Sequence, residues 1–158
     1  MGGRKTLDAA DQLVNEARPG APRQVNLRCA VSMVYHALAH WLANCVADVL
    51  AGATRPRDHG WVPVYRGVDH RQVKQQCRQG RIPTHLAPTL RRFAAELAEM
   101  QGRRHSADYD PKARFSKRDA VAFIASANRM LLDLQETTPA EKRALAIHVL
   151  FKERPGSF

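Results

Sequence analysis

The chain of 158 residues has few cysteines and lacks the signatures of the commonest metal and nucleotide sites. Cys29, Cys45 and Cys77 lie far apart and form no Cys-x-x-Cys pair, so the sequence predicts neither a disulfide framework nor a zinc site. It also contains no glycine-rich phosphate loop and no serine nucleophile elbow, which argues against nucleotide hydrolysis by a P-loop. We therefore expect no metal and no cofactor, with the cysteines acting as small core residues.

Apolar runs long enough to span a bilayer are also missing. The first residues, Met1–Lys5, lack the apolar stretch of a secretory signal. These absences predict a cytoplasmic protein with no membrane partner. The length suits one domain, residues 1–158, with a single core.

Acidic residues are scarce beside basic ones, 15 against 25, and the formal net charge is +10. Arginine supplies 19 of the 25 basic residues. Because the planar guanidinium group binds phosphate well, this excess favours a polyanionic partner such as RNA. An acidic protein partner, simple solubility or a GC-rich genome would explain the same excess, so charge alone does not choose among them.

The apolar residues recur at steps of three and four, and no alternating strand pattern is present. We therefore predict an all-α fold, an up-and-down bundle of five to six helices. The expected helices are Leu7–Ala17, about 22–51, Trp61–Cys77, Leu86–Met100, one that opens at Ser116 and one that opens at Thr138. The last helix is apolar nearly all round, which predicts that it is buried or docks a second subunit.

The segment Arg103–Pro111 gathers two guanidinium groups, an imidazole, two carboxylates and a phenol within nine positions. It lies where a periodic helix should end and a loop with Pro111 should begin. Catalytic and binding residues are often held at such a junction, on irregular backbone supported by a rigid element. The simpler interpretation is a solvated helix end whose arginines complement the helix dipole.

A second polar cluster lies on the predicted third helix. Arg66 and His70 are four residues apart, Lys74 continues their face, and Arg71 and Arg78 border it. His70 is suited to proton transfer near neutral pH, and Arg66 to holding a phosphate or stabilising a charged transition state. The alternative is a solvated basic face.

Two other histidine patterns are weaker. His36 and His40 have the spacing of two metal ligands on one helical face, but no third ligand completes a site, so we expect them to flank the apolar stripe. His148 falls in the apolar last helix, where a hydrogen-bonded core histidine is expected.

Three stretches together resemble one protein family. Leu27 to His40, LRCAVSMVYHALAH, resembles the "RRAVStaYYALFH" helix of bacterial HEPN-domain proteins. Arg103–Pro111 resembles their "R..ADYDP" segment, and Leu145–Arg154 resembles their apolar C-terminal helix with basic residues at its end. The likeness covers most of the chain, and its first two motifs are specific only in combination.

The resemblance implies an HEPN-like helical bundle that forms a homodimer. Many members of the family are metal-independent ribonucleases of toxin–antitoxin, CRISPR or anti-phage systems. In them an Arg, four to six further residues and a His form the catalytic signature, and the pairs from both protomers meet across the dimer. The 2′-hydroxyl attacks the adjacent phosphate, His assists proton transfer and Arg stabilises charge. RNA, a second copy, and a cognate antitoxin or an effector-complex protein are the partners implied.

This sequence departs from that signature. After four intervening residues Arg103 is followed by Asp108 rather than His, and Arg104 directly precedes His105. Arg143/His148 and Arg78/His85 have the family spacing, but so many arginines produce such matches by chance. Either His105 or His70 supplies the imidazole, with Arg104 or Arg66 as its partner, or catalysis is lost. In the second case an Arg104–Asp108 bond orders the loop and Tyr109 packs its ring.

Two functional hypotheses follow. The first is a metal-independent endoribonuclease of a bacterial toxin or anti-phage system. The second is a non-catalytic subunit that contacts nucleic acid or a partner protein. The candidate catalytic residues are Arg104, His105, Asp108, Tyr109, Arg66 and His70. The candidate nucleic-acid-binding residues are Arg103, Arg71, Lys74 and Arg78.

Overall fold

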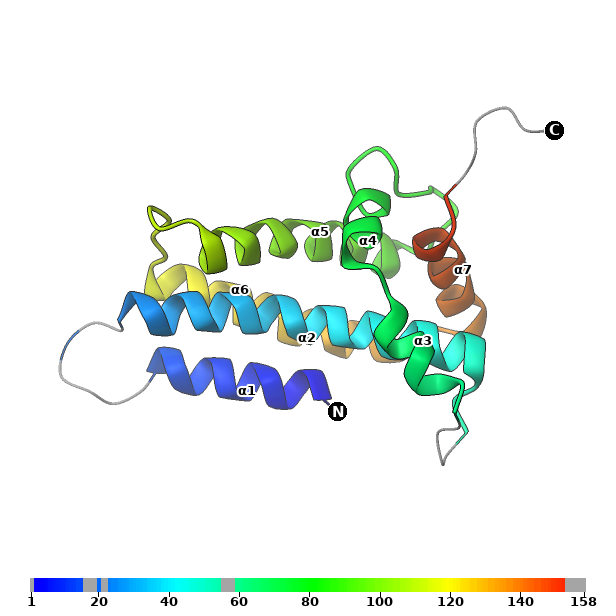
Figure 1. Cartoon of the computed structure of the whole chain (residues 1–158), viewed down its shortest axis with the longest axis horizontal. Helices are drawn as coiled ribbons and strands as arrows, with labels where there is room; N and C mark the ends of the chain where they lie inside the picture. Colours follow the sequence, from blue (N-terminus) through cyan, green and yellow to red (C-terminus); the bar gives the residue numbers. More distant parts are fainter. Residues whose placement is uncertain (1, 16–19, 21–22, 55–58, 153–158) are drawn as a thin grey trace. The chain divides into compact units, whose positions relative to one another are not determined.

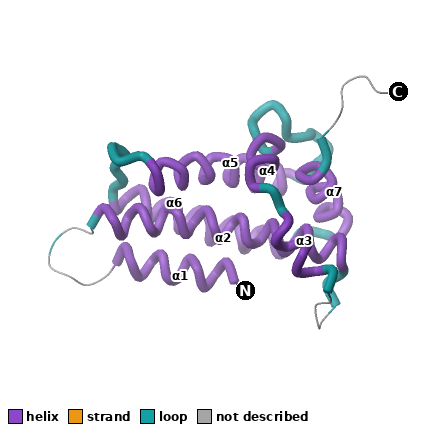
Figure 2. Tube along the Cα trace, in the orientation of Figure 1, coloured by secondary structure: helices purple, strands orange, loops and turns teal. Residues whose placement is uncertain are grey.

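The computed structural model describes residues 2–15, 20, 23–54 and 59–152, and these form helices and loops with no strand among them (Figures 1 and 2). The helices are α1 (Gly2–Asn15), α2 (Gln24–Ala51), α3 (Trp61–Gly67), α4 (His70–Gln76), α5 (Pro88–Tyr109), α6 (Lys117–Asp133), the short 3-10 helix η1 (Leu134–Glu136) and α7 (Pro139–Leu150). The all-α prediction is confirmed. The expected Ala17 end of the first helix, and the start of the second at about residue 22, lie outside the described residues.

The predicted third helix is two helices, so the described residues contain seven α-helices rather than five or six. Val68 and Asp69 have extended backbone, and Asp69 Oδ1 accepts the N–H groups of Arg71 (2.8 Å) and Gln72 (3.2 Å) as the N-cap of α4. The hydrogen bond from the Gln72 N–H, and to a smaller extent that from the Arg71 N–H, lowers the pKa of the Asp69 carboxyl group. Their stabilising effect is complete above the ordinary carboxyl pKa and is lost as the pH falls through the lowered value.

The caps predicted for the last two helices are found. Thr138 Oγ1 accepts the N–H of Glu141 at 3.2 Å, and the Glu141 carboxylate accepts the N–H of Thr138 at 2.8 Å, which is a complete capping box. Ser116 Oγ likewise accepts the N–H of Asp119 at 3.0 Å. Each cap satisfies backbone donors that a helix start would otherwise leave open.

The chain divides into two compact units. The first consists of Met1–Trp41 and Glu99–Glu136, and the second of Leu42–Ala98 and Thr137–Phe158. In the first unit α1 packs on α6, and its glycines lie close to α2: a Cβ on Gly3 would come within 3.1 Å of the Ala37 carbonyl oxygen. The buried apolar side chains of this unit include Leu7, Val14, Val31, Leu38, Ile124 and Leu134.

In the second unit α4 packs on α7, and two glutamines of α4 cap the end of α7. The last four carbonyl groups of any helix lack partners within it. Gln72 Nε2 donates to the carbonyl oxygens of Val149 and Leu150, and Gln76 Nε2 donates to that of His148 at 2.9 Å. The N–H of Phe151 takes the remaining carbonyl, that of Ile147. All four orphan groups are therefore satisfied.

We predict that Gln76→Met lowers the free energy of unfolding by about 1–3 kcal/mol, because it leaves carbonyl groups at the end of α7 without a donor. Gln76 is buried and its amide also donates to the Phe151 carbonyl oxygen at 3.1 Å. Gln75→Met is the matched control, since Gln75 is only half-buried. Urea denaturation of both variants checks the prediction, and equal stabilities would contradict it.

Candidate functional site

Arg28 of α2 holds the end of α5 and the loop that follows it, within the first unit. Its guanidinium group donates to the Ala107 carbonyl oxygen at 3.0 Å and to that of Ala113. Ala107 lies in the last turn of α5, where carbonyl groups lack helical partners and a cation is favoured. Arg28 therefore caps α5 from a neighbouring helix and fixes residues 107–113 against α2.

Gln24, one turn before Arg28 on the same helix, holds the far end of that loop. Its Nε2 donates to the Phe115 carbonyl oxygen at 2.7 Å, and its Oε1 accepts the Phe115 N–H at 3.1 Å. One side chain thus satisfies both backbone groups of a loop residue. Ser32, one turn after Arg28, makes a weak hydrogen bond of 3.4 Å to Asp108 Oδ2. We call Gln24, Arg28 and Ser32 the α2 polar stripe.

The α2 polar stripe was not predicted from the sequence. Positions four apart on a helix share a face, so the spacing of Gln24, Arg28 and Ser32 was a readable signal beside the apolar stripe of the same helix. The spacing did not say which segment this face would meet. In the structure the stripe meets residues 107–115, so the first two stretches that resemble HEPN proteins contact each other.

The predicted loop at Arg103–Pro111 is helical as far as Tyr109, and only Asp110 and Pro111 lie beyond α5. The expectation of irregular backbone at Arg104 and His105 is therefore wrong. The physical reason is that the apolar stripe of α5 continues beyond Met100 to the buried Ala107, whose carbonyl group Arg28 caps.

Arg104 and Asp108 pair one turn apart at the end of α5. Arg104 Nε lies 2.8 Å from Asp108 Oδ2, although the N–H is not directed at that oxygen, so the contact is an ion pair without a linear hydrogen bond. The guanidinium carbon lies 5.7 Å from the ring centre of Tyr35 and 6.0 Å from that of Tyr109. The pair predicted from the sequence is present, but it braces the helix rather than a loop.

His105 and Tyr109 lie on the exposed side of the same turn. Their ring centres are 5.1 Å apart with the planes tilted by 49°. Tyr109 is 64% exposed, so its ring does not pack as the alternative of lost catalysis would have it. We call Arg104, His105, Asp108 and Tyr109 the α5 cluster. Tyr109 links the two pairs, because its ring lies beside both His105 and the Arg104 guanidinium group, while the Arg104 and Asp108 side chains are 29% and 27% exposed.

Arg103 is held apart from this cluster. It pairs with Glu99 one turn earlier, and its guanidinium carbon lies 4.5 Å from the ring centre of Phe123 on α6. The side chain remains 40% exposed. These contacts hold the Arg103 side chain against α6, and part of it remains exposed to solvent.

Arg66 and His70 belong to different helices of the second unit, so the prediction that they share one helical face is wrong. Arg66 is in the last turn of α3, whereas His70 is the first residue of α4, because Asp69 caps a new helix between them. Arg71 and Arg78 are exposed and Lys74 is half-buried. The second cluster thus presents basic side chains to solvent.

Three other histidines, His36, His40 and His148, lie outside both clusters. His148 Nε2 lies 2.7 Å from the Gln76 carbonyl oxygen, and because a carbonyl only accepts, Nε2 carries the proton. The hydrogen bond predicted for His148 is found, but the residue is half-buried rather than part of the core. His36 contacts the Tyr35 ring edge-on at 5.4 Å, and His40 lies against Gly2. Within the described residues no group of three or more His, Cys, Asp or Glu is placed to hold a metal ion.

The three cysteines differ in exposure. Burial raises the pKa of both Cys45 and Cys77 to about 12, whereas Cys29 is exposed. The thiolate is the reactive form, so the two buried thiols should be inert at neutral pH. We predict that a thiol reagent labels one cysteine in the native protein and all three after denaturation. Rapid labelling of more than one native thiol, measured by mass spectrometry, would contradict the prediction.

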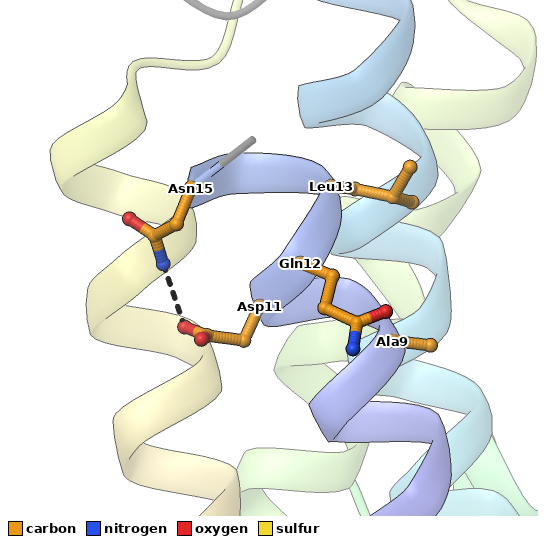
Figure 3. Close-up of a pocket in the computed structure, with 5 residues that line it drawn as sticks. All are labelled: Ala9, Asp11, Gln12, Leu13 and Asn15. Atoms are coloured by element: carbon orange, nitrogen blue, oxygen red, sulfur yellow. Dashed lines mark hydrogen bonds between the residues drawn. The ribbon is translucent and has the colours of Figure 1, made fainter. Parts of the chain in front are cut away.

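A shallow pocket lies on α1, away from the candidate site residues. Figure 3 shows its lining residues, Ala9, Asp11, Gln12, Leu13 and Asn15, all from the second half of that helix. Asn15 Nδ2 donates to Asp11 Oδ1 at 2.8 Å, and Gln12 adds a further amide to the lining. None of the candidate residues from the sequence lines it.

No described helix is long and apolar enough to cross a bilayer. No protein-family model matches the chain, and neither a curated protein nor a solved structure matches it.

Proposed function

We propose that this chain is an HEPN-like protein that acts on RNA as a metal-independent endoribonuclease, through the α5 cluster. The observation that carries the proposal is the α5 cluster itself: Tyr109 lies beside both His105 and the Arg104–Asp108 pair, and Arg28 of the helix that resembles the HEPN motif caps the end of α5. The net charge of +10 suits a polyanionic substrate.

Each member of the cluster has a role in the proposed reaction. The 2′-hydroxyl attacks the adjacent phosphorus, the P–O5′ bond breaks, and a 2′,3′-cyclic phosphate and a free 5′-hydroxyl result. Imidazole gives and takes protons near neutral pH, so His105 transfers the proton to or from the reacting oxygens. The Arg104 guanidinium group, whose Nε forms the ion pair with Asp108, stabilises charge on the phosphate.

Asp108 and Tyr109 support this arrangement. Asp108 stands where the family keeps its histidine, and its ion pair fixes the direction of the Arg104 side chain. The exposed ring of Tyr109 offers a base a stacking surface beside His105. The resemblance implies that the active form is a homodimer in which two such clusters act together.

Incubation of the protein with an unstructured RNA in the presence of EDTA tests the proposal. We expect RNA binding that weakens as salt increases, together with fragments that appear in proportion to enzyme. The absence of fragments would overturn the proposed nuclease activity, and the absence of RNA binding as well would overturn any role on RNA.

A second function is favoured by a specific observation in α7. Ile147 of α7 is 54% exposed, and Phe151, the extended C-cap residue that follows this helix, is 64% exposed. Exposed apolar side chains close together in the chain are typical of a docking face. If the protein binds RNA without cleaving it, the non-catalytic alternative holds, with a cognate antitoxin, an effector-complex protein or a second copy on this face.

A further inference from the structure

A basic segment follows the α5 cluster directly. Lys112, Arg114, Lys117 and Arg118 fall within seven residues that contain no acid, and all four are exposed. In the part of the chain that the structure describes, none of these four side chains makes a hydrogen bond or an ion pair. We call these four residues the basic loop. Its charge is therefore directed at solvent and is not neutralised by the protein.

Two side chains of α2 hold the backbone of the basic loop in place. Arg28 donates to the Ala113 carbonyl oxygen, and Gln24 binds both backbone groups of Phe115. Ala113 and Phe115 are half-buried, while Lys112 and Arg114 on either side of Ala113 are exposed. The inward residues anchor the loop and the outward residues carry its charge, so the backbone that carries Lys112 and Arg114 is held in place before any ligand binds.

The stability of the fold does not account for the charge. Lys117 and Arg118 are in the first turn of α6, where the helix dipole disfavours cations by about 0.3–1 kcal/mol each. Four like charges in one short segment also repel one another. An anionic ligand would reverse both effects, since it is attracted by the cations and by the helix start alike.

We propose that the basic loop binds the phosphodiester backbone of single-stranded RNA and leads the strand to the α5 cluster. This inference rests on the proposed action on RNA. RNA is favoured over a membrane surface because Phe115, the one apolar ring of the segment, is half-buried and held by Gln24. Tyr109, exposed at the start of the path, provides the stacking surface that single-strand binders combine with cations.

The test compares RNA binding by two variants of equal charge. One neutralises the basic loop (Lys112→Gln, Arg114→Gln, Lys117→Gln, Arg118→Gln). The other neutralises four exposed cations elsewhere (Arg4→Gln, Lys5→Gln, Arg91→Gln, Lys152→Gln). The probe is a fluorescein-labelled oligouridylate, titrated at several salt concentrations in EDTA, and circular dichroism confirms that both variants are folded.

Each phosphate contact on a single strand contributes about 0.7 to the slope of log affinity against log salt. The basic-loop variant should lose about 2 to 3 from that slope and at least about tenfold in affinity at 100 mM salt. The control variant should keep most of the slope. Equal losses in the two variants, or an unchanged basic-loop variant, overturn this inference while the wild-type protein still binds RNA.

The same pair of variants separates the other outcomes. If the wild-type protein binds no oligouridylate, the proposed action on RNA fails and this inference fails with it. If the basic-loop variant loses binding to phosphatidylserine vesicles but keeps its affinity for RNA, the segment is a lipid-binding surface and the inference is overturned.

Discussion

His105→Ala should reduce cleavage of RNA in EDTA by about 10²- to 10⁴-fold, the range expected when a general acid–base group is removed. The imidazole is exposed and is held beside Tyr109 with the ring centres 5.1 Å apart, so its loss leaves the fold intact. Affinity for RNA should change little, because the cations are unaltered. Initial rates of fragment formation and titrations of binding measure the two effects separately.

Two histidine variants serve as controls for this result. His85→Ala removes an exposed imidazole outside both clusters and should cleave as the wild-type protein does. His70→Ala removes the imidazole of the second cluster, which belongs to the other compact unit. A large loss with His70→Ala and none with His105→Ala would move the proposed chemistry from α5 to the start of α4.

Arg28→Met should lower the free energy of unfolding by about 2–4 kcal/mol, because it removes charged donors from two carbonyl groups. Methionine keeps much of the aliphatic stem, so the loss reports the guanidinium contacts to Ala107 and Ala113. For a chain of this size the thermal midpoint should fall by about 5–15 °C. Differential scanning calorimetry gives both the midpoint and the enthalpy.

The control for this variant is Arg23→Met. Arg23 is exposed and lies just before α2, and among the described residues its guanidinium group makes no bond like those of Arg28 to Ala107 and Ala113. Trypsin adds a local measurement: the bonds after Lys112 and Arg114 should be cut faster in Arg28→Met, because the loop has lost its anchor. Equal midpoints and equal rates of proteolysis in the two variants would show that Arg28 does not hold this segment.

Most of the helical content was predictable from the sequence because apolar spacing reports burial directly. The stripe of α2 and the box at Thr138–Glu141 are local signals, and both are found. The break between α3 and α4 was not predicted, because Val68 and Val73 are buried in either arrangement and the apolar pattern does not distinguish them. The cue lay in Asp69, whose side chain starts a new helix.

The candidate site was predicted only in part, for a different reason. Residue types drew attention to Arg104 and Asp108, and their spacing of four already permitted the ion pair that is found. That α5 extends to Tyr109 depends on Arg28, 79 residues away in sequence from Ala107. A contact between such distant segments has no local signature, so neither the α2 polar stripe nor the anchored loop followed from the sequence alone.

The central claim is that this chain cleaves RNA through the 2′-hydroxyl with the α5 cluster. Its most direct test incubates the wild-type protein in EDTA with an end-labelled RNA and with the same sequence fully 2′-O-methylated. The account predicts that only the unmodified RNA is cut, that the fragments end in 2′,3′-cyclic phosphate, and that His105→Ala cuts neither. Cleavage of the methylated strand, or equal cleavage by His105→Ala, would contradict it.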